Sequence, residues 1–204
     1  MDSHQSFVNA KFKQVAKFIP ENSKILDIGC GDGSIINFLN KPNYYGVDGD
    51  EKNIKALLSK NIKAKKIDFN KEKIPFEKER FDFILILDIL EHVVNPRELL
   101  KEAKDRLKEN GKIIVTLPND YHILNKIRFI FNKHLTEDPF APYGHLHYFP
   151  ISSGERFLEN CGFNFSEKIY LAPIKPAIIP QSIKKILIVL FPQAFVRDVL
   201  YVLS

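Results

Sequence analysis

The sequence of 204 residues lacks tryptophan and has only one methionine and two cysteines. The cysteines, Cys30 and Cys161, are far apart, which argues against a disulfide framework and favours a reducing compartment, so we expect a cytoplasmic protein. The first twenty residues lack the continuous apolar centre of a signal peptide. Charged residues and Pro192 interrupt the apolar C-terminal region, so no run reaches the roughly 20 residues that a bilayer-spanning helix needs.

The sequence also lacks long blocks of one charge. Its net charge of +5 and pI near 9.0 would suit a nucleic-acid partner. However, basic and acidic residues interleave, as in 101–112, and lysine outnumbers arginine, so we expect no nucleic acid to bind. Two segments differ: Lys126, Arg128 and Lys133 flank an apolar pattern that could meet an anionic substrate or a membrane, and 182–191 could make a peripheral membrane contact.

Short apolar, β-prone segments alternate with helical ones along the first 120 residues. The predicted strands are bounded by Gly, Pro, Asn or Asp and cover 24–28, 43–47, 64–69, 81–87 and 112–117. The predicted helices, the last of them stopped by Asn110-Gly111, cover about 5–18, 34–39, 51–60 and 96–108. This alternation predicts an α/β fold, a doubly wound parallel sheet with helices on both faces.

Residues 1–204 are predicted to form a single domain with three appended parts. These are an N-terminal helix within 1–20, a lid or acceptor insertion at 118–150, and a C-terminal helix and last strand within 172–204. Around them the pattern predicts a helix near 121–132, a loop at 138–150, a helix begun by Ser152 or Ser153 and ended by Gly162, and a strand at 163–171.

The segment KILDIGCGDG, residues 24–33, runs from the first predicted strand into three glycines. A phosphate-binding P-loop would need a lysine after the last glycine, and a dinucleotide fingerprint would need a glycine where Ser34 stands. A carboxylate at Asp27 would repel a pyrophosphate and attract a cationic amino group. The loop therefore predicts a nucleoside ligand that carries positive charge.

The stretch LDIGCGDG resembles the first motif of class I S-adenosylmethionine-dependent methyltransferases. The second motif, YYGVDGD, places Asp48 where an acid accepts both ribose hydroxyls. The resemblance implies S-adenosylmethionine as cofactor and a Rossmann-like seven-stranded sheet, mostly parallel with one antiparallel strand at the C-terminus. It also implies that Asp68-Phe69 contacts adenine and that Leu87 and Asp88 lie beside the methionine part. The expected cofactor-binding residues are Asp27, Gly29, Cys30, Gly31, Asp48, Gly49, Asp68, Phe69, Leu87 and Asp88.

The same resemblance implies methyl transfer to an oxygen or nitrogen of a small acceptor, with lipid-linked molecules included. A hydroxyl acceptor must lose a proton, and the candidate general bases are His145 and then His92. The pattern Asp88-x-x-Glu91-His92 resembles the carboxylate-rich patch with which ubiquinone-pathway O-methyltransferases hold a divalent metal. We expect no metal here, because hard cations usually need more oxygen ligands.

Two alternatives remain open at this point. TLPN, HLHYF and the final YVL also resemble methionine-biosynthesis proteins that partner a homoserine acyltransferase, which would make the chain a non-catalytic regulator. The apolar helix at 182–191 would instead suit an enzyme that works at a membrane surface on a lipid acceptor.

Overall fold

The computed structural model describes residues 3–131, 144–173 and 181–204. Lys133 and the first part of the predicted 138–150 loop lie outside the described residues. So does part of the predicted 118–150 insertion.

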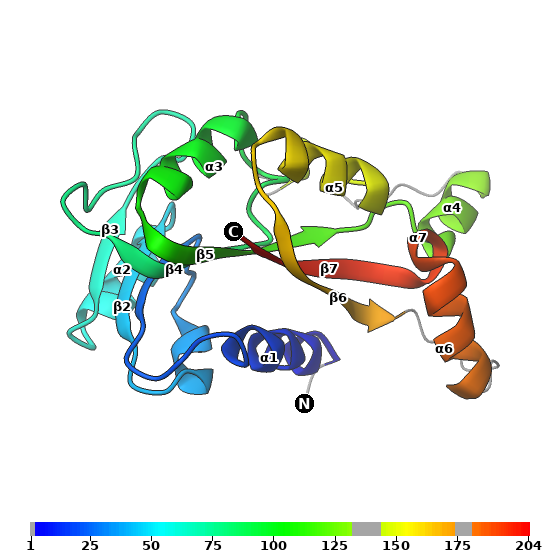
Figure 1. Ribbon diagram of the computed structural model, residues 1–204, viewed down its shortest axis with the longest axis horizontal. Coiled ribbons are helices and arrows are strands. Elements are labelled where there is room, and N and C mark those ends of the chain that lie inside the picture. The colour runs from blue at the N-terminus through cyan, green and yellow to red at the C-terminus, as the bar shows by residue number, and fades with distance from the viewer. Residues whose placement is uncertain (1–2, 132–143, 174–180) are drawn as a thin grey trace.

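A seven-stranded sheet forms the centre of the molecule (Figure 1). Its strands run in the order β3-β2-β1-β4-β5-β7-β6. All neighbours pair in parallel except β7, which is antiparallel to both β5 and β6. The predicted fold, with one reversed strand near the C-terminus, is confirmed. The strands are β1 (Lys24–Ile28), β2 (Asn43–Asp48), β3 (Lys63–Lys66), β4 (Phe81–Leu87), β5 (Leu107–Pro118), β6 (Phe165–Pro173) and β7 (Val196–Leu203).

Helices cover both faces of the sheet, and each face has its own apolar core (Figure 1). On one face α3 (Pro96–Asp105) and α5 (Ile151–Asn160) pack against β4 and β5. On the other face lie α1 (Ser3–Ala16), the 3₁₀ helix η1 (Ser34–Phe38) and α2 (Glu51–Leu58). The remaining helices are gathered beyond the N-terminal end of β7. They are α4 (Ile123–Ile130), α6 (Gln181–Leu190) and α7 (Pro192–Phe195). Among the described helices, none has the length and apolarity needed to cross a bilayer.

Two predicted boundaries are wrong around the glycine loop and β5. The predicted helix at 34–39 is only a 3₁₀ helix, because Gly33 gives its first turn no side-chain cap and the chain is already extended at Leu39. The predicted helix at 96–108 ends at Asp105, and Asn110-Gly111 lies inside β5 rather than before it. Pairing of Phe81 with Leu107 draws this stretch into the sheet.

Two further boundaries shift for local reasons. β3 ends at Lys66 rather than at 69, because Asp68 Oδ1 accepts the Asn70 N–H at 3.0 Å and so starts a turn. The helix expected to begin at Ser152 or Ser153 begins at Ile151 after Pro150, without a side-chain cap. Gly162 follows its end with φ +80°, as the sequence predicted.

Candidate active site

The glycine loop folds back onto the carboxyl end of β2. The N–H groups of Gly29 and Cys30 donate to the carbonyl oxygen of Val47 at 2.8 and 3.0 Å. Gly29 has φ +78°, and a Cβ there would lie 2.0 Å from Cδ1 of Ile89, so a side chain fits neither the backbone nor the space. The loop therefore lies at the carboxyl edge of the sheet, where ligands bind in open α/β folds.

Asp48, the last residue of β2, is fixed by three donors. Its Oδ2 accepts the Gly31 N–H at 2.8 Å, and its Oδ1 accepts the Asp50 N–H at 2.8 Å and the Asn53 side-chain amide at 3.2 Å. The carboxylate therefore has a set direction at the edge of the sheet, with lone pairs left to accept ligand hydroxyls.

A cavity of about 860 Å³ opens beside Asp48, within the size range of ligand sites. Seven of the residues named from the sequence line it: Gly29, Asp48, Gly49, Asp68, Phe69, Asp88 and His92. The sequence reasoning did not assign the other lining residues, which are Asp50, Asn53, Lys66, Ile67, Asn70, Glu72, Ile89 and Val93. Asp50 caps α2, accepting the Lys52 N–H at 2.8 Å, and this Asx pattern was readable in the sequence.

Asp27, Cys30, Gly31 and Leu87 are not among the cavity-lining residues. Alternation along β1 turns Asp27 toward the α1 side of the sheet, where it is 3% exposed and accepts the Tyr44 hydroxyl at 2.5 Å. Burial raises the pKa of Asp27 to about 7. Leu87 packs into the same core.

Asp68 and Phe69 lie in the loop after β3 and face the cavity from that side. A hydrogen bond from Lys71, 2.8 Å from Oδ2, holds the pKa of Asp68 below its usual value. Phe69 is partly buried against the core. This pair thus offers an anionic oxygen and an aromatic ring together, the two groups that the resemblance implies for adenine.

Asp88 follows β4 in a left-handed conformation, φ +56°. Its carboxylate accepts the Thr116 hydroxyl at 2.5 Å and pairs with Lys11 from α1. Lys11 is 5% exposed, so the Asp88 carboxylate is paired with a buried ammonium group. Sequence reasoning missed Lys11, because nothing along α1 distinguishes it from Lys13, the helix's other lysine.

His145 and Asp120 form a pair next to this cavity. His145 Nδ1 lies 3.1 Å from Asp120 Oδ2, and this bond raises the pKa of His145. The His145 ring meets the His92 ring edge to face, with centroids 5.0 Å apart. His92 lines the cavity, and its pKa is lowered by burial. Both predicted histidines therefore lie together, and Asp120 is the partner that the sequence did not reveal.

Backbone contacts hold both members of the pair. The N–H groups of Leu146 and His147 donate to Glu91 O at 2.7 and 3.1 Å. On the other side, Asn119 of the TLPN segment donates to the carbonyls of Gln193 and Val196 at 2.9 and 2.7 Å. The turn after β4 and the α7 region thus position His145 and Asp120 from opposite sides.

A second cavity, of about 630 Å³, lies on the far side of Asp120. Its lining is mostly aromatic and aliphatic: Tyr121, Phe129, Ile130 and Tyr148, with Asp120 and Lys126 as the charged residues. Asp120 lines this apolar cavity and His92 lines the one beside Asp48, and His145 contacts both residues, so it links the two cavities.

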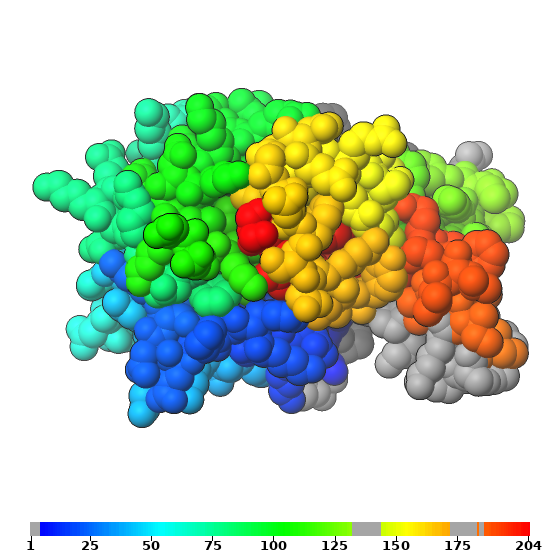
Figure 2. Space-filling model, in the orientation of Figure 1, coloured from blue at the N-terminus to red at the C-terminus, as the bar shows by residue number. Residues whose placement is uncertain are grey.

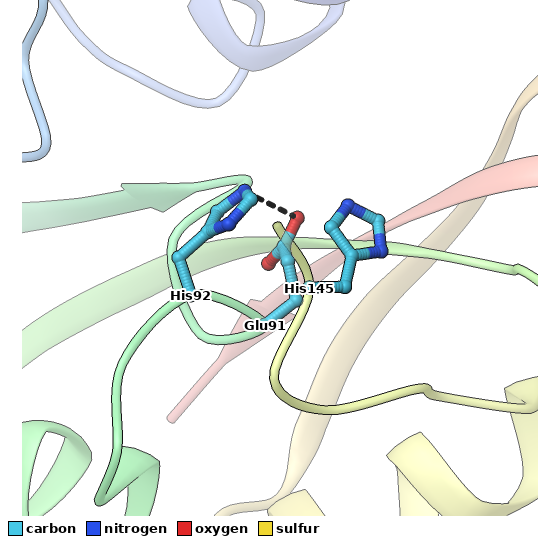
Figure 3. A group of neighbouring side chains, drawn as sticks. All are labelled: Glu91, His92 and His145. Carbon is cyan, nitrogen blue, oxygen red and sulfur yellow. Dashed lines mark ion pairs between the residues drawn. The ribbon is translucent and has the colours of Figure 1, made fainter. Parts of the chain in front are cut away.

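Glu91, His92 and His145 each offer a ligand atom within 4.8 Å of the others (Figure 3). Glu91 is 1% exposed, its Oε2 has no hydrogen-bond partner among the described residues, and burial raises its pKa to about 8. His92 Nδ1 contacts the Gly144 carbonyl at 3.2 Å and His145 Nδ1 contacts Asp120, so both imidazoles are oriented through Nδ1, and His92 Nε2 lies 4.0 Å from Glu91 Oε1. This mixed donor set fits a transition metal such as Zn²⁺ better than Mg²⁺. Asp88, which is paired with Lys11, does not belong to the group.

Comparison with known proteins identifies the family. The family model described as a methyltransferase domain matches residues 1–168. An uncharacterised protein of Methanocaldococcus jannaschii is 33% identical over 174 residues, covering 80% of this chain and 68% of that protein. A ubiquinone biosynthesis O-methyltransferase of Pelagibacter ubique is 34% identical over 108 residues, covering 48% of this chain and 43% of that enzyme.

The fold is shared with solved methyltransferases. An S-adenosylmethionine-dependent methyltransferase from Archaeoglobus fulgidus superposes with a TM-score of 0.63 at 21% identity, covering 97% of this chain and 93% of that one. The chain spans less than two thirds of the length of several curated relatives, 59% in the case of a second Methanocaldococcus jannaschii protein. The chain belongs to the methyltransferase-domain family, so its predicted assignment as a methyltransferase is confirmed, and its fold is that of solved S-adenosylmethionine-dependent methyltransferases.

Proposed function

We propose that the protein transfers a methyl group to an oxygen or nitrogen atom of a small acceptor, with a hydroxyl as the favoured acceptor group. The observation that carries this proposal is the contact of His145 with a residue of each cavity, His92 of the one beside Asp48 and Asp120 of the apolar one. The cavity beside Asp48 suits the cofactor, and the apolar cavity beyond Asp120 suits the acceptor.

S-adenosylmethionine, when bound, supplies a methyl group already activated on a positively charged sulfur. The protein's task is then to orient the acceptor and, for a hydroxyl, to take its proton. His145 donates its Nδ1–H to Asp120, which leaves Nε2 free to accept the hydroxyl proton. Asp120 stabilises the resulting imidazolium. The acceptor oxygen would then take the methyl group, and the sulfur would keep the electron pair of the carbon–sulfur bond.

The lining of the second cavity defines the acceptor class. Tyr121, Phe129 and Tyr148 offer aromatic faces and Ile130 an aliphatic one. Such a pocket favours a flat or chain-like apolar molecule with one polar group directed toward Asp120 and His145. A phenol or a lipid-linked aromatic alcohol meets both requirements.

The regulatory alternative is not carried forward. The matched family model is described as a methyltransferase domain, and the Pelagibacter ubique relative is named as an O-methyltransferase. The cytoplasmic location remains part of the proposal, and it is supported by two cysteines that are both free.

Turnover of a panel of phenols and primary amines, with and without His145→Gln, tests the proposal. We expect the substitution to lower kcat on phenols about 100-fold or more, the usual contribution of a positioned base. Cofactor affinity, measured by calorimetry on the same variant, should be unchanged and serves as the folding control. Equal turnover by the variant on every phenol would contradict the role of His145.

A further inference from the structure

Exposed apolar side chains gather at one end of the molecule. Of the fifteen large apolar residues found exposed in the described part of the chain, thirteen lie here and only Leu58 and Val94 lie elsewhere. The thirteen are Tyr121, Leu124, Ile127, Phe129, Ile130, Phe131, Leu146, Tyr148, Ile183, Ile186, Val189, Leu190 and Phe191, and we call them the apolar end face. Soluble surfaces rarely carry so concentrated a patch without a binding role.

Two helices supply most of this face. Figures 1 and 2 show α4 and α6 beside each other at the end of the sheet remote from β3. Gln193, in the short helix after α6, donates to the Asn119 side chain at 2.6 Å just before α4, so the two helices have a common anchor. None of the α4 residues is buried, although five of the eight are aliphatic or aromatic. The helix therefore presents its apolar side chains outward.

The charge of these helices has one sign. Residues 121–131 and 181–197 contain two lysines in α6, one lysine and one arginine in α4, and Arg197, but no aspartate or glutamate. Other parts of the chain mix the two signs, as in 101–112. Apolar side chains combined with only positive charge are the composition of helices that lie in the interface of an anionic membrane.

We propose that the apolar end face docks the protein on the surface of an anionic lipid bilayer, with α4 and α6 lying in the interface. α6 has 10 residues and is about 15 Å long, half of the hydrocarbon core, so it can lie on a bilayer but not span it. A second copy of the chain is a poorer occupant, because a self-paired face would bring the same cations together.

If the proposed function holds, the apolar end face and the acceptor cavity share part of their surface. Tyr121, Phe129, Ile130 and Tyr148 belong both to the end face and to the lining of this cavity. A docked protein would thus hold the apolar cavity at the lipid surface, where a lipid-linked acceptor resides. Docking itself can be measured without cofactor or acceptor.

Vesicle flotation with the full chain tests the docking. The probes are phosphatidylcholine vesicles with and without added phosphatidylglycerol, at low salt and at about 1 M salt, where the Debye length is only about 3 Å. The test variant is Ile130→Glu with Val189→Glu, at positions 77% and 74% exposed. The matched control is Leu58→Glu with Val94→Glu, at apolar positions that are 51% and 65% exposed and lie outside the face.

We expect the wild type and the control variant to float with anionic vesicles, and binding to fall about tenfold or more on neutral vesicles, in high salt or in the test variant. Equal flotation of the test and control variants would overturn the proposal, as would a dimer in solution that only the test variant dissociates. Turnover of a soluble phenol by the wild type separates the two proposals. If the wild type floats with anionic vesicles but does not methylate the phenol, only the proposed function is refuted. If it methylates the phenol but does not float, only the docking is refuted.

Discussion

Replacing Asp27 with asparagine should make the protein more stable, and increasingly so as the pH rises. Asp27 is 3% exposed, and burial raises its pKa from 3.8 to about 7. The folded protein therefore binds the proton more tightly than the unfolded chain does. Such a carboxyl does not lower the free energy of unfolding at a pH below its pKa in the unfolded chain. The loss of stability grows as the pH rises toward its pKa in the folded protein. Asparagine keeps the oxygen that accepts the Tyr44 hydroxyl but carries no charge.

The size of this effect follows from the two pKa values. Each pKa unit corresponds to about 1.4 kcal/mol, so ionised Asp27 lowers the free energy of unfolding by about 4 kcal/mol above pH 7. At pH 5 the loss is only about 1.7 kcal/mol by the same relation. The stability difference between Asp27→Asn and wild type should therefore grow by roughly 2.5 kcal/mol between pH 5 and pH 8.

Urea unfolding of both proteins at several pH values, without ligand, measures this difference. Burial also raises the pKa of Glu91 to about 8 and that of Asp198 to about 6, but these groups titrate in both proteins and cancel. A difference that stays constant with pH, or shrinks, would refute the reasoning. The same variant tests the predicted cofactor contact: if Asp27 attracts the amino group, S-adenosylmethionine should bind at least about tenfold more weakly at pH 8.

Four other substitutions or treatments test the site. Asp48→Ala should weaken S-adenosylmethionine binding by about 10- to 100-fold in calorimetry, since hydrogen bonds to a charged group contribute about 1.5–3 kcal/mol; equal affinity of the wild type for NADH would contradict the cofactor assignment. Lys11→Met should lower the free energy of unfolding by about 1–3 kcal/mol, because it leaves the Asp88 carboxylate without its cation, and adding Asp88→Asn should restore part of the loss. Asp120→Asn should lower kcat and move the midpoint of the pH–rate profile to lower pH, because the aspartate holds the pKa of His145 up; an unmoved midpoint would mean that another group titrates. A chelator should leave turnover unchanged if His145 is the base, whereas loss of activity restored by Zn²⁺ would assign His145 to a metal site with Glu91 and His92.

The sequence predicted strand boundaries correctly where the apolar pattern was typical of a strand and of nothing else. The ranges 24–28 and 81–87 match β1 and β4 to the residue, because each is a mostly apolar segment bounded by polar or glycine residues. β5 was misjudged at its start, where LKENGK is polar and Asn110-Gly111 is typical of a turn. Pairing with β4 overrides this local preference, and pairing between distant segments cannot be read from composition.

The site divides in the same way. The glycine loop, Asp48 and the Asp68-Phe69 pair could be found because each occupies a fixed place relative to its own strand. Asp120 and Lys11 could not, because their partners are 25 and 77 residues away along the chain. Asp27 is the opposite case, since its place in the motif suggested a ligand contact and the alternation of β1 directs it into the core.

The sequence by itself determined the order of strands and helices, the glycine loop and the class of cofactor, since these depend on periodicity and on spacing within one strand–loop–helix unit. Only the tertiary structure decided that Asp120 orients His145, that Lys11 neutralises Asp88, and that α4 and α6 form one apolar end face. The physical reason is that such contacts join side chains from separate elements, whose distance and direction are fixed only when the sheet is assembled and its two cores are packed.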